Sequence, residues 1–257
     1  MIKNLKLFTL LFLTITIHSC SNNDDDDYVT QPKTIFGHVA TSTNYMYLTS
    51  ALQKTNLAVV LDGVENYTLY APNDMAFARF LMQVGYNNLD EVPTELLTKI
   101  LLNHVMVGGI EYRDFVTGYF KTAATSEASQ TPLSIHIEQV NMRVTLNGES
   151  RITQGNVRAT NGIIHAVDRV IPIPSIVTFA KADKGLTNLL IALTRPDLTA
   201  DFASILSTSA GTTPAPFTVF APTDQAFVDL LVELGAQSLS DIDEPTLKAT
   251  LTYHVIG

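Results

Sequence analysis

Hydrophobic and polar positions follow the same order in two stretches of the chain. Tyr67–Gly85 reads YTLYAPNDMAFARFLMQVG, and Phe217–Gly235 reads FTVFAPTDQAFVDLLVELG. Each begins with alternating apolar residues, which are typical of a β-strand, and continues through Ala-Pro, which favours an extended turn. After the turn, apolar residues recur at spacings of four and three, as on the buried face of an amphipathic helix. Each stretch therefore predicts a strand, a turn and a helix.

The start and the buried face of each helix can also be predicted. Asp74 and Asp224 stand just before the helical runs, and an aspartate there can accept from the free amides of the first turn, so both are expected to be N-caps. The predicted buried faces consist of Phe77, Leu81 and Val84 in the first stretch and Phe227, Leu231 and Leu234 in the second. In the first copy, a short helix over 96–102 is predicted to lead into a strand over 104–107.

The two stretches belong to a long internal repeat. Ala71 and Ala221, like His104 and His254, stand 150 positions apart, and no gap is needed between these pairs. A repeat of this length indicates tandem domains rather than a solenoid. We expect a first domain over 34–174 and a second over 175–257.

The first copy continues through a stretch that has no counterpart in the second. Residues 133–139 (LSIHIEQ), 142–148 (MRVTLNG) and 161–174 (NGIIHAVDRVIPIP) predict β-strands, and the Asn-Gly pairs at 147–148 and 161–162 predict tight turns. Since Gly257 corresponds to Val107, we expect the second domain to be incomplete. Residues 251–257 are then expected to form a strand without its partners, and 176–257 are not expected to fold stably alone.

The N-terminal segment has the pattern of a secretory signal. Lys3 and Lys6 precede an apolar run over 7–17, which is too short to span a bilayer comfortably. Cys20 follows and is the only cysteine, so no intrachain disulfide is possible. The pattern resembles a bacterial lipobox, which implies a signal peptide over 1–19 and a lipid on Cys20. The alternative is a free thiol at the end of an ordinary secretory peptide.

An acidic stretch follows the cysteine. Residues 21–33 read SNNDDDDYVTQPK, and four consecutive aspartates repel one another and stay solvated, so 20–33 are predicted to be a flexible tether. A run of this kind just after a lipidated cysteine also resembles the surface-export signal of lipoproteins in the Bacteroidota. Calcium binding is not expected, because the run lacks a preformed loop of ligands.

Composition and charge narrow the classes of partner. The chain has 257 residues, of which 46% are hydrophobic and 16% charged, as in a globular protein. The formal net charge is −9, and no basic stripe interrupts it. Because phosphate neutralisation needs clustered lysine and arginine, nucleic acid is not an expected partner.

Three motifs together resemble those of fasciclin-like domains, in their usual order. They are TLYAPNDMAF and its copy TVFAPTDQAF, the His-Val segments NHVMVGG and YHVIG, and NGIIHAVDRVIPIP. The resemblance implies an α+β fold, a wedge-shaped β-sandwich with flanking helices, in an extracellular adhesion module without a cofactor. The motif residues are Thr68, Ala71, Pro72, Asp74, Phe77, Asn161, Gly162, His165, Asp168, Thr218, Ala221, Pro222, Asp224 and Phe227.

The resemblance also points to a candidate interaction surface. A Tyr-His pair at the second motif is implicated in integrin contact in animal members of the family. Here the pair occurs as Tyr253-His254, whereas the first copy has Asn103-His104. We carry over the location of these four residues as a candidate surface, without the ligand.

Catalysis and metal binding are not expected. His104 and His165 are predicted to be structural histidines that donate to backbone carbonyls, and His136 alternates with isoleucines, so it is predicted on the solvent-exposed face of its strand. A Ser134/His165/Asp168 triad is disfavoured because no GxSxG motif is present and residues three apart on a strand point to opposite faces. We expect no enzymatic activity, no metal and no cofactor.

The most favoured function is adhesion by a lipoprotein anchored in the outer membrane and facing the cell exterior, with an extracellular protein or glycan as its partner. One alternative is an accessory glycan-binding lipoprotein of an outer-membrane uptake system. The other is a structural protein of the envelope. The absence of tryptophan mildly disfavours a site where sugars stack.

Overall fold

The computed structural model describes residues 32–208 and 215–257. The predicted signal peptide, Cys20 and almost all of the acidic tether lie outside the described residues. Residues 32–174 contain α1 (Ile35–Ala40), α2 (Met46–Lys54), α3 (Leu57–Leu61), β1 (Tyr67–Pro72), α4 (Asp74–Val84), α5 (Thr94–Leu102), β2 (Val105–Val107), β3 (Gly118–Thr125), β4 (Pro132–Val140), β5 (Arg143–Leu146), β6 (Ser150–Ala159) and β7 (Gly162–Val167). Residues 175–257 contain α6 (Ile176–Ala182), α7 (Thr187–Leu193), α8 (Phe202–Leu206), β8 (Thr218–Val219), α9 (Asp224–Leu234), α10 (Glu244–Tyr253) and β9 (Val255–Ile256).

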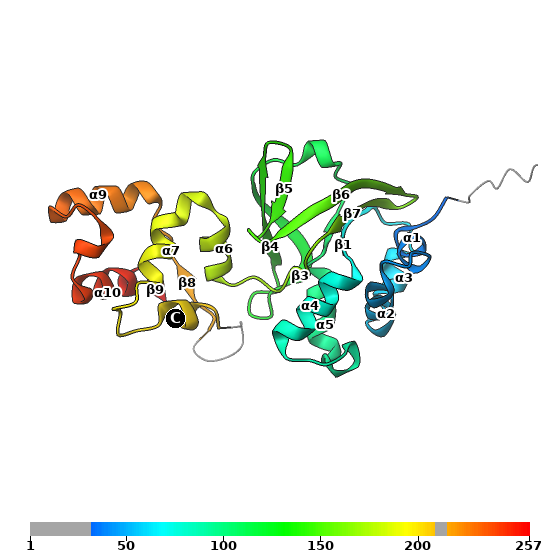
Figure 1. Ribbon diagram of the computed structural model, residues 1–257, viewed down its shortest axis with the longest axis horizontal. Helices are drawn as coiled ribbons and strands as arrows, with labels where there is room; N and C mark the ends of the chain where they lie inside the picture. Colours follow the sequence, from blue (N-terminus) through cyan, green and yellow to red (C-terminus); the bar gives the residue numbers. More distant parts are fainter. Residues whose placement is uncertain (1–31, 209–214) are drawn as a thin grey trace, which may run out of the picture. The chain divides into compact units, whose positions relative to one another are not determined.

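We call residues 32–174 the first region and residues 175–257 the second region. A seven-stranded sheet organises the first region, in the order β2-β1-β7-β6-β5-β4-β3 (Figure 1). β1 lies beside β2 in antiparallel and beside β7 in parallel orientation, and the other neighbours are antiparallel. Two register shifts along β6 and β7 mark bulges, which bend a sheet. The predicted α+β sandwich with flanking helices is therefore confirmed.

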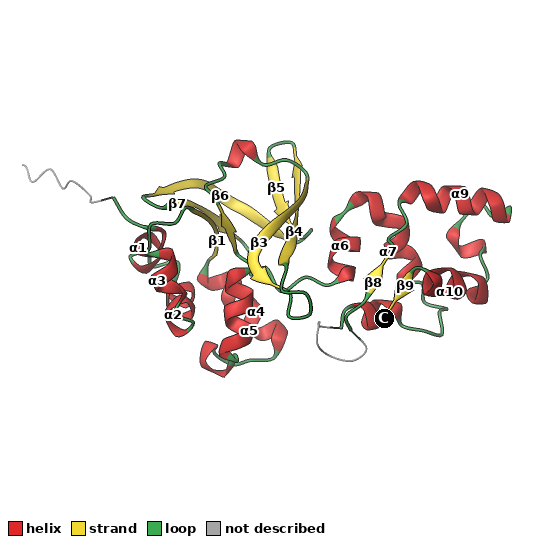
Figure 2. Cartoon of the chain, turned by 180° about the vertical axis from the view of Figure 1, so that it is seen from behind, coloured by secondary structure: helices red, strands yellow, loops and turns green. Residues whose placement is uncertain are grey.

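Two apolar cores stabilise this region. One lies between the helices and the sheet and includes Ile35, Leu69 and Phe77, whereas the other lies among the strands and includes Tyr70 and Ile135. Neighbouring residues of β1 thus belong to different cores, because successive side chains of a strand point to opposite faces. Figure 2 shows the helices α1 to α5 on one side of the strands.

The predicted helices form, with corrected ends and faces. α5 begins at Thr94, two residues before the predicted start. Phe77 and Leu81 are buried as predicted, but Val84 is exposed, and Phe80 is buried in its place. Leu234 of α9 is also exposed. Val84 and Leu234, which were wrongly predicted to be buried, are each the last residue of their helix. Each stands next to the glycine that ends the helix, where the helix extends beyond the core.

The predicted strands form with different ends, and two others were missed. The segment 161–174 is a strand only as far as Val167, and β2 begins at Val105 rather than at His104. Asn147 and Gly148 both have positive φ, as the predicted tight turn requires. β3 and β6 were not predicted, since glycine and polar residues interrupt their apolar pattern.

Residues 175–257 have a small apolar core that includes Phe227, Leu247 and Leu251. The predicted strand over 251–257 is wrong for its first half, because α10 continues to Tyr253. The remaining β9 pairs antiparallel with β8, so it is not without a partner.

Candidate functional site

Asn103 and His104 lie at the junction between α5 and β2, and both side chains are fully buried. The amide of Asn103 donates to Pro172 O at 2.9 Å and accepts from the Thr122 hydroxyl at 3.2 Å. The prediction that this pair belongs to an interaction surface is wrong, because the segment after β7 covers both side chains.

His104 bridges two parts of the chain through both ring nitrogens. Nε2 accepts from Ile171 N at 2.8 Å, so Nδ1 carries the proton and donates to Ile100 O at 2.7 Å. Burial lowers the pKa of His104 to about 4, while the hydrogen bond to Ile100 opposes this shift. The imidazole is therefore neutral near pH 7 and has the predicted structural role.

The corresponding pair in the second region has a different environment. Tyr253 is 89% exposed, and His254 is half-buried. Nδ1 of His254 bonds Thr250 O at 2.8 Å, which repeats the contact of His104 with Ile100. Only this copy of the predicted interaction pair presents a side chain to solvent.

Thr68 stands at the start of β1 and connects this strand to the segment after β2. Its fully buried hydroxyl donates to Gly108 O at 2.6 Å and accepts from Ile110 N at 2.8 Å. Its counterpart Thr218 is exposed. Ala71 and Pro72, which follow Thr68, are buried, whereas Ala221 is exposed and Pro222 half-buried.

Asp74 and Asp224 are not the N-caps of α4 and α9, because each is the first residue inside its helix. The caps are Asn73 and Thr223, one position earlier. The Asp74 carboxylate accepts from Tyr47 N at 2.8 Å and so caps the first turn of α2. Asp224 does the same for α7, by accepting from Asn188 N at 2.7 Å. The pattern predicted a capping carboxylate, but only the tertiary fold shows that it caps another helix.

Asn161 and Gly162 connect the helices to the sheet. The buried Asn161 amide accepts from Ile35 N at 2.8 Å and donates to Leu61 O and Gly63 O at 2.9 and 2.7 Å. At Gly162, a Cβ atom would stand 1.9 Å from Tyr67 O, so only glycine fits. This turn therefore holds α1 and α3 against the start of β1.

His165 and Asp168 do not form a catalytic relay. His165 Nε2 donates to Ile110 O at 2.9 Å, and Nδ1 accepts from Asn156 N at 3.3 Å. The Asp168 carboxylate accepts from Arg151 N at 2.8 Å. Burial lowers the pKa of His165, although the bond to Ile110 opposes this shift. Both side chains form hydrogen bonds with backbone groups, which is a structural role.

The prediction that His136 is exposed is wrong. The side chain is 3% exposed, and the Tyr119 ring packs against it with centroids 4.9 Å apart. The alternation of apolar residues failed as a guide because β4 is covered on both faces. His136 Nδ1 and Asn147 Nδ2 are buried and lack a hydrogen-bond partner among the described residues.

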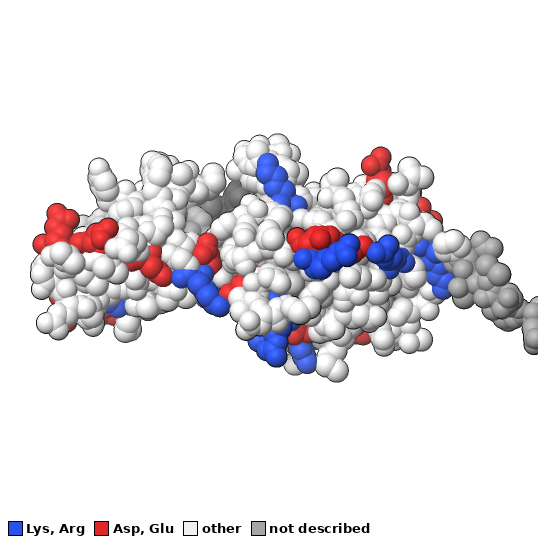
Figure 3. All heavy atoms as spheres, turned by 90° about the horizontal axis from the view of Figure 1, so that it is seen from above, with Lys and Arg blue, Asp and Glu red and all other residues white. Residues whose placement is uncertain are grey.

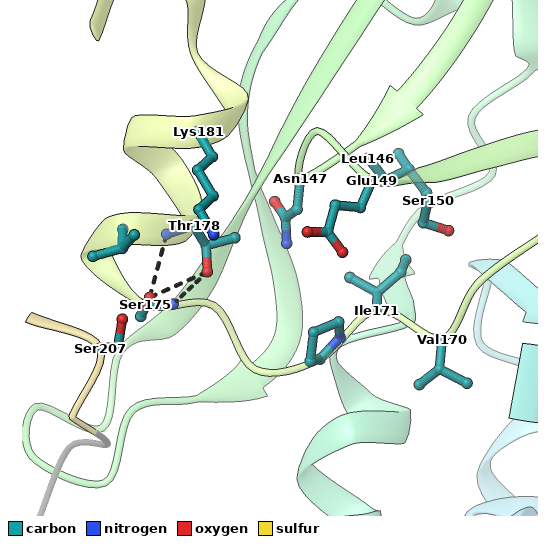
Figure 4. Close-up of a pocket in the computed structure, with 12 residues that line it drawn as sticks. Leu146, Asn147, Glu149, Ser150, Val170, Ile171, Ser175, Thr178, Lys181 and Ser207 are labelled. Atoms are coloured by element: carbon teal, nitrogen blue, oxygen red, sulfur yellow. Dashed lines mark hydrogen bonds between the residues drawn. The ribbon is translucent and has the colours of Figure 1, made fainter. Parts of the chain in front are cut away.

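A cavity of about 170 Å³ lies beside Asn147. Figure 4 shows the side chains that line it. The β5–β6 turn, the segment 170–172 and α6 line it, and Glu149 and Lys181 carry its charges. Small-molecule pockets commonly measure about 300 to 1,000 Å³. The cavity is thus too small for more than a very small polar group, and it does not favour the binding of a glycan chain.

The exposed face of α4 carries an apolar stripe. Met75 and Met82 are 63% and 81% exposed, and Arg79 between them donates to the Met75 sulfur at 3.1 Å. We call Met75, Arg79 and Met82 the α4 stripe. Sequence reasoning missed it because only the buried face of the helix was considered. The corresponding positions of α9 are Gln225, Asp229 and Val232, so the second copy has a mostly polar face.

The surface charges do not indicate a nucleic-acid interface. Acidic and basic side chains lie next to one another on the face shown in Figure 3. Within residues 32–208 and 215–257, no three histidine, cysteine, aspartate or glutamate side chains gather as a metal site. None of the helices that the structure describes has the length and apolar character needed to cross a bilayer.

Comparison with known proteins gives a consistent family match. The family model described as "Fasciclin domain" matches residues 43–174 and 184–257. Periostin of Homo sapiens is 26% identical over 199 residues, which cover 77% of this chain and 22% of that protein. A fasciclin-like arabinogalactan protein of Arthroderma benhamiae is 24% identical over 207 residues, which cover 77% of this chain and 46% of that protein. The chain therefore spans less than half the length of either relative.

A solved structure is also similar. It is a FAS1 domain pair from the insect cell adhesion molecule fasciclin I, with a TM-score of 0.46 and 17% identity. The similarity covers 80% of this chain and 67% of that chain.

Proposed function

Because this chain belongs to the fasciclin domain family, we propose that it is a non-enzymatic adhesion protein that binds an extracellular protein. The family match carries the proposal, since it extends over most of the described residues and fasciclin-like domains are best known as extracellular adhesion modules. The environment of the motif residues supports it. The motif side chains form hydrogen bonds that hold the fold together, as seen for His104, His165, Asp168 and Asn161. A partner would therefore bind other side chains, which lie on the exposed surface.

We further propose that a lipid on Cys20 anchors the protein in the outer membrane and that the protein faces the cell exterior. The charged start, the short apolar run and the position of the cysteine support the anchor. The four aspartates after it support export to the surface and a solvated tether.

The α4 stripe is the contact surface that we favour in the first region. Unbranched, polarizable methionine side chains adapt to the shape of a partner, and Arg79 adds a planar donor between them. A retention assay on immobilised extracellular-matrix proteins tests the adhesion proposal. The protein is expected to be retained saturably, and Met75→Ser/Met82→Ser is expected to reduce retention at least about tenfold, as loss of two interface anchors would.

The matched control is Val232→Ser on α9, at the position that corresponds to Met82. It also removes an exposed apolar side chain, 77% exposed in the structure, and is expected to leave retention unchanged. An equal loss of retention in the two variants would contradict the proposal that the α4 stripe is the contact surface. A complete lack of saturable retention would contradict the adhesion proposal itself.

The anchor has an independent test. Cys20→Ser is expected to move the protein from the membrane fraction to the soluble fraction, because the lipid cannot be attached. Protease added to intact cells is expected to degrade the anchored protein. Membrane association of Cys20→Ser would contradict the lipid anchor, and protection from protease would contradict outward exposure.

A further inference from the structure

The α4 stripe presents two thioether groups to solvent on one face of a helix. Met75 and Met82 are both exposed, and they lie two helical turns apart within α4. Methionine is among the residue types most often buried, and Met106 of the same region is only 4% exposed. A small dissolved reagent can therefore reach the side chains of the stripe, whereas the fold shields Met106.

The two sulfur atoms of the stripe have different surroundings. Arg79 Nη2 donates to the Met75 sulfur at 3.1 Å, and no donor among the described residues bonds the Met82 sulfur. A hydrogen bond engages one lone pair of a thioether, which is a weak acceptor, and so makes the sulfur a weaker nucleophile. Met82 is therefore the more reactive of the two, because its side chain is also the more exposed.

The second copy of the motif keeps the helix but has no sulfur on this face. The stripe positions carry Gln225, Asp229 and Val232, and Gln225 Nε2 donates to Asp229 Oδ1 at 2.9 Å. The buried face is preserved, since Phe77 and Phe227 are both buried. Packing of the helix thus requires the buried aromatic residue and does not require the exposed methionines.

We infer that Met75 and Met82 form a modification site at which a peroxide oxidises both sulfurs and thereby releases the partner of the α4 stripe. The release rests on the proposed function, whereas the oxidation does not. With hydrogen peroxide, a sulfur lone pair attacks one oxygen and the O–O bond breaks. The bound oxygen passes its proton to the departing hydroxide, which leaves as water. The thioether loses two electrons and becomes a sulfoxide, and the peroxide is reduced.

Oxidation changes what the stripe offers to a partner. A sulfoxide is polar, so covering it costs free energy unless it is hydrogen-bonded, whereas covering a thioether is favourable. The sulfoxide oxygen of Met75 is a stronger acceptor than the sulfur and takes the bond from Arg79, which removes this donor from the contact surface. The fold is not affected, because the stripe lies on the exposed face of α4 and the buried Met106 is shielded.

Oxidation itself is tested on the full chain with hydrogen peroxide and peptide mapping by mass spectrometry. Met82 is expected to react faster than Met75, and Met106 is expected to react slowest. Met142, which is 77% exposed outside the stripe, is the internal reference. Arg79→Leu keeps a side chain beside Met75 but cannot donate, so it is expected to raise the rate at Met75 at least about twofold. Rates at Met75 and Met82 as slow as at Met106 would overturn the site, and an unchanged rate in Arg79→Leu would overturn the protection by Arg79.

Release is tested in the retention assay on immobilised extracellular-matrix proteins. Oxidation of wild type is expected to reduce retention at least about tenfold. Met75→Leu/Met82→Leu is expected to keep its retention after the same treatment, because leucine is apolar and of similar volume but has no sulfur. The matched control is Met46→Leu/Met142→Leu, which removes two exposed methionines outside the stripe and is expected to lose retention as wild type does.

The outcomes separate this inference from the proposed function. If untreated protein is retained and retention survives full oxidation of Met75 and Met82, the inference is overturned and the adhesion proposal stands. An equal loss of retention in wild type and Met75→Leu/Met82→Leu would also overturn it, because another oxidised residue would then cause the release. If untreated protein shows no saturable retention, the proposed function fails and the release fails with it.

Discussion

Acid is expected to destabilise the first region through His104. Its pKa is about 4 in the folded protein and 6.5 when exposed, because burial disfavours the charged ring. The folded state therefore favours the neutral form, and the unfolded state binds more protons between these values. The stability that His104 contributes is complete above pH 6.5, falls as the pH decreases and levels off below about pH 4.

The size of the effect follows from these two values. The free energy of unfolding is expected to decrease by about 2 kcal/mol between pH 7 and pH 5, and by about 3 kcal/mol between pH 7 and pH 3.5. The structural cause is at Nε2, which accepts from Ile171 N and would become a donor on protonation. Because His104 is fully buried, solvent does not screen this loss.

Hydrogen exchange measured by mass spectrometry tests this prediction on the full chain, because it reports the opening free energy of β1 and β2 separately from the second region. After correction for intrinsic exchange rates, wild type is compared with His104→Gln, whose side-chain amide can still donate and accept hydrogen bonds but does not titrate. The variant is expected to be less stable at pH 7, and the difference is expected to narrow by about 2 kcal/mol at pH 5. If the opening free energies of the two proteins changed in parallel with pH, the reasoning would be refuted. The carboxylates and His165 are present in both proteins, so only the titration of His104 can change the difference between them.

Two further substitutions test the connection between helices and sheet. Gly162→Ala is expected to lower the free energy of unfolding of the first region by at least about 3 kcal/mol in urea unfolding, because the added methyl group would overlap Tyr67 O. The control Gly85→Ala, at a residue with positive φ but no atom within 4 Å of the added Cβ, is expected to cost only about 1 kcal/mol in the same assay. Equal losses of stability in the two variants would contradict the steric argument. Asn161→Ala is expected to cost about 3 kcal/mol in the same assay, because it leaves Ile35 N–H and two carbonyls without their buried partner. A loss below about 1 kcal/mol would show that water replaces the amide.

Local patterns predicted the elements that depend on neighbours in the chain. Alternation followed by Ala-Pro and a helical spacing identified β1 with α4, and the internal repeat identified α9. The Asn-Gly pair at 147–148 identified a tight turn, because its conformation requires positive φ. In each case the physical cause lies within a few residues.

Burial and hydrogen-bond partners were predicted less well. His136 was assigned to an exposed face from its alternation with isoleucines, but Tyr119 packs against it. Asp74 was assigned to its own helix, but its partner is Tyr47, 27 positions earlier. Such partners follow from how the elements pack, and the residues near each group in the chain do not reveal them.

The sequence alone determined the repeat, the order of strand, turn and helix in each copy, and the family that the motifs resemble. Only the tertiary structure decided that Asn103 and His104 are fully buried, whereas Tyr253 is exposed. Asn103 and His104 lose their exposure because residues 171 and 172, almost 70 positions later, return to bond them. His254 has the same local contact but no such segment beside it among the described residues. Local chemistry sets which groups can bond, and the path of the chain sets which of them find a partner.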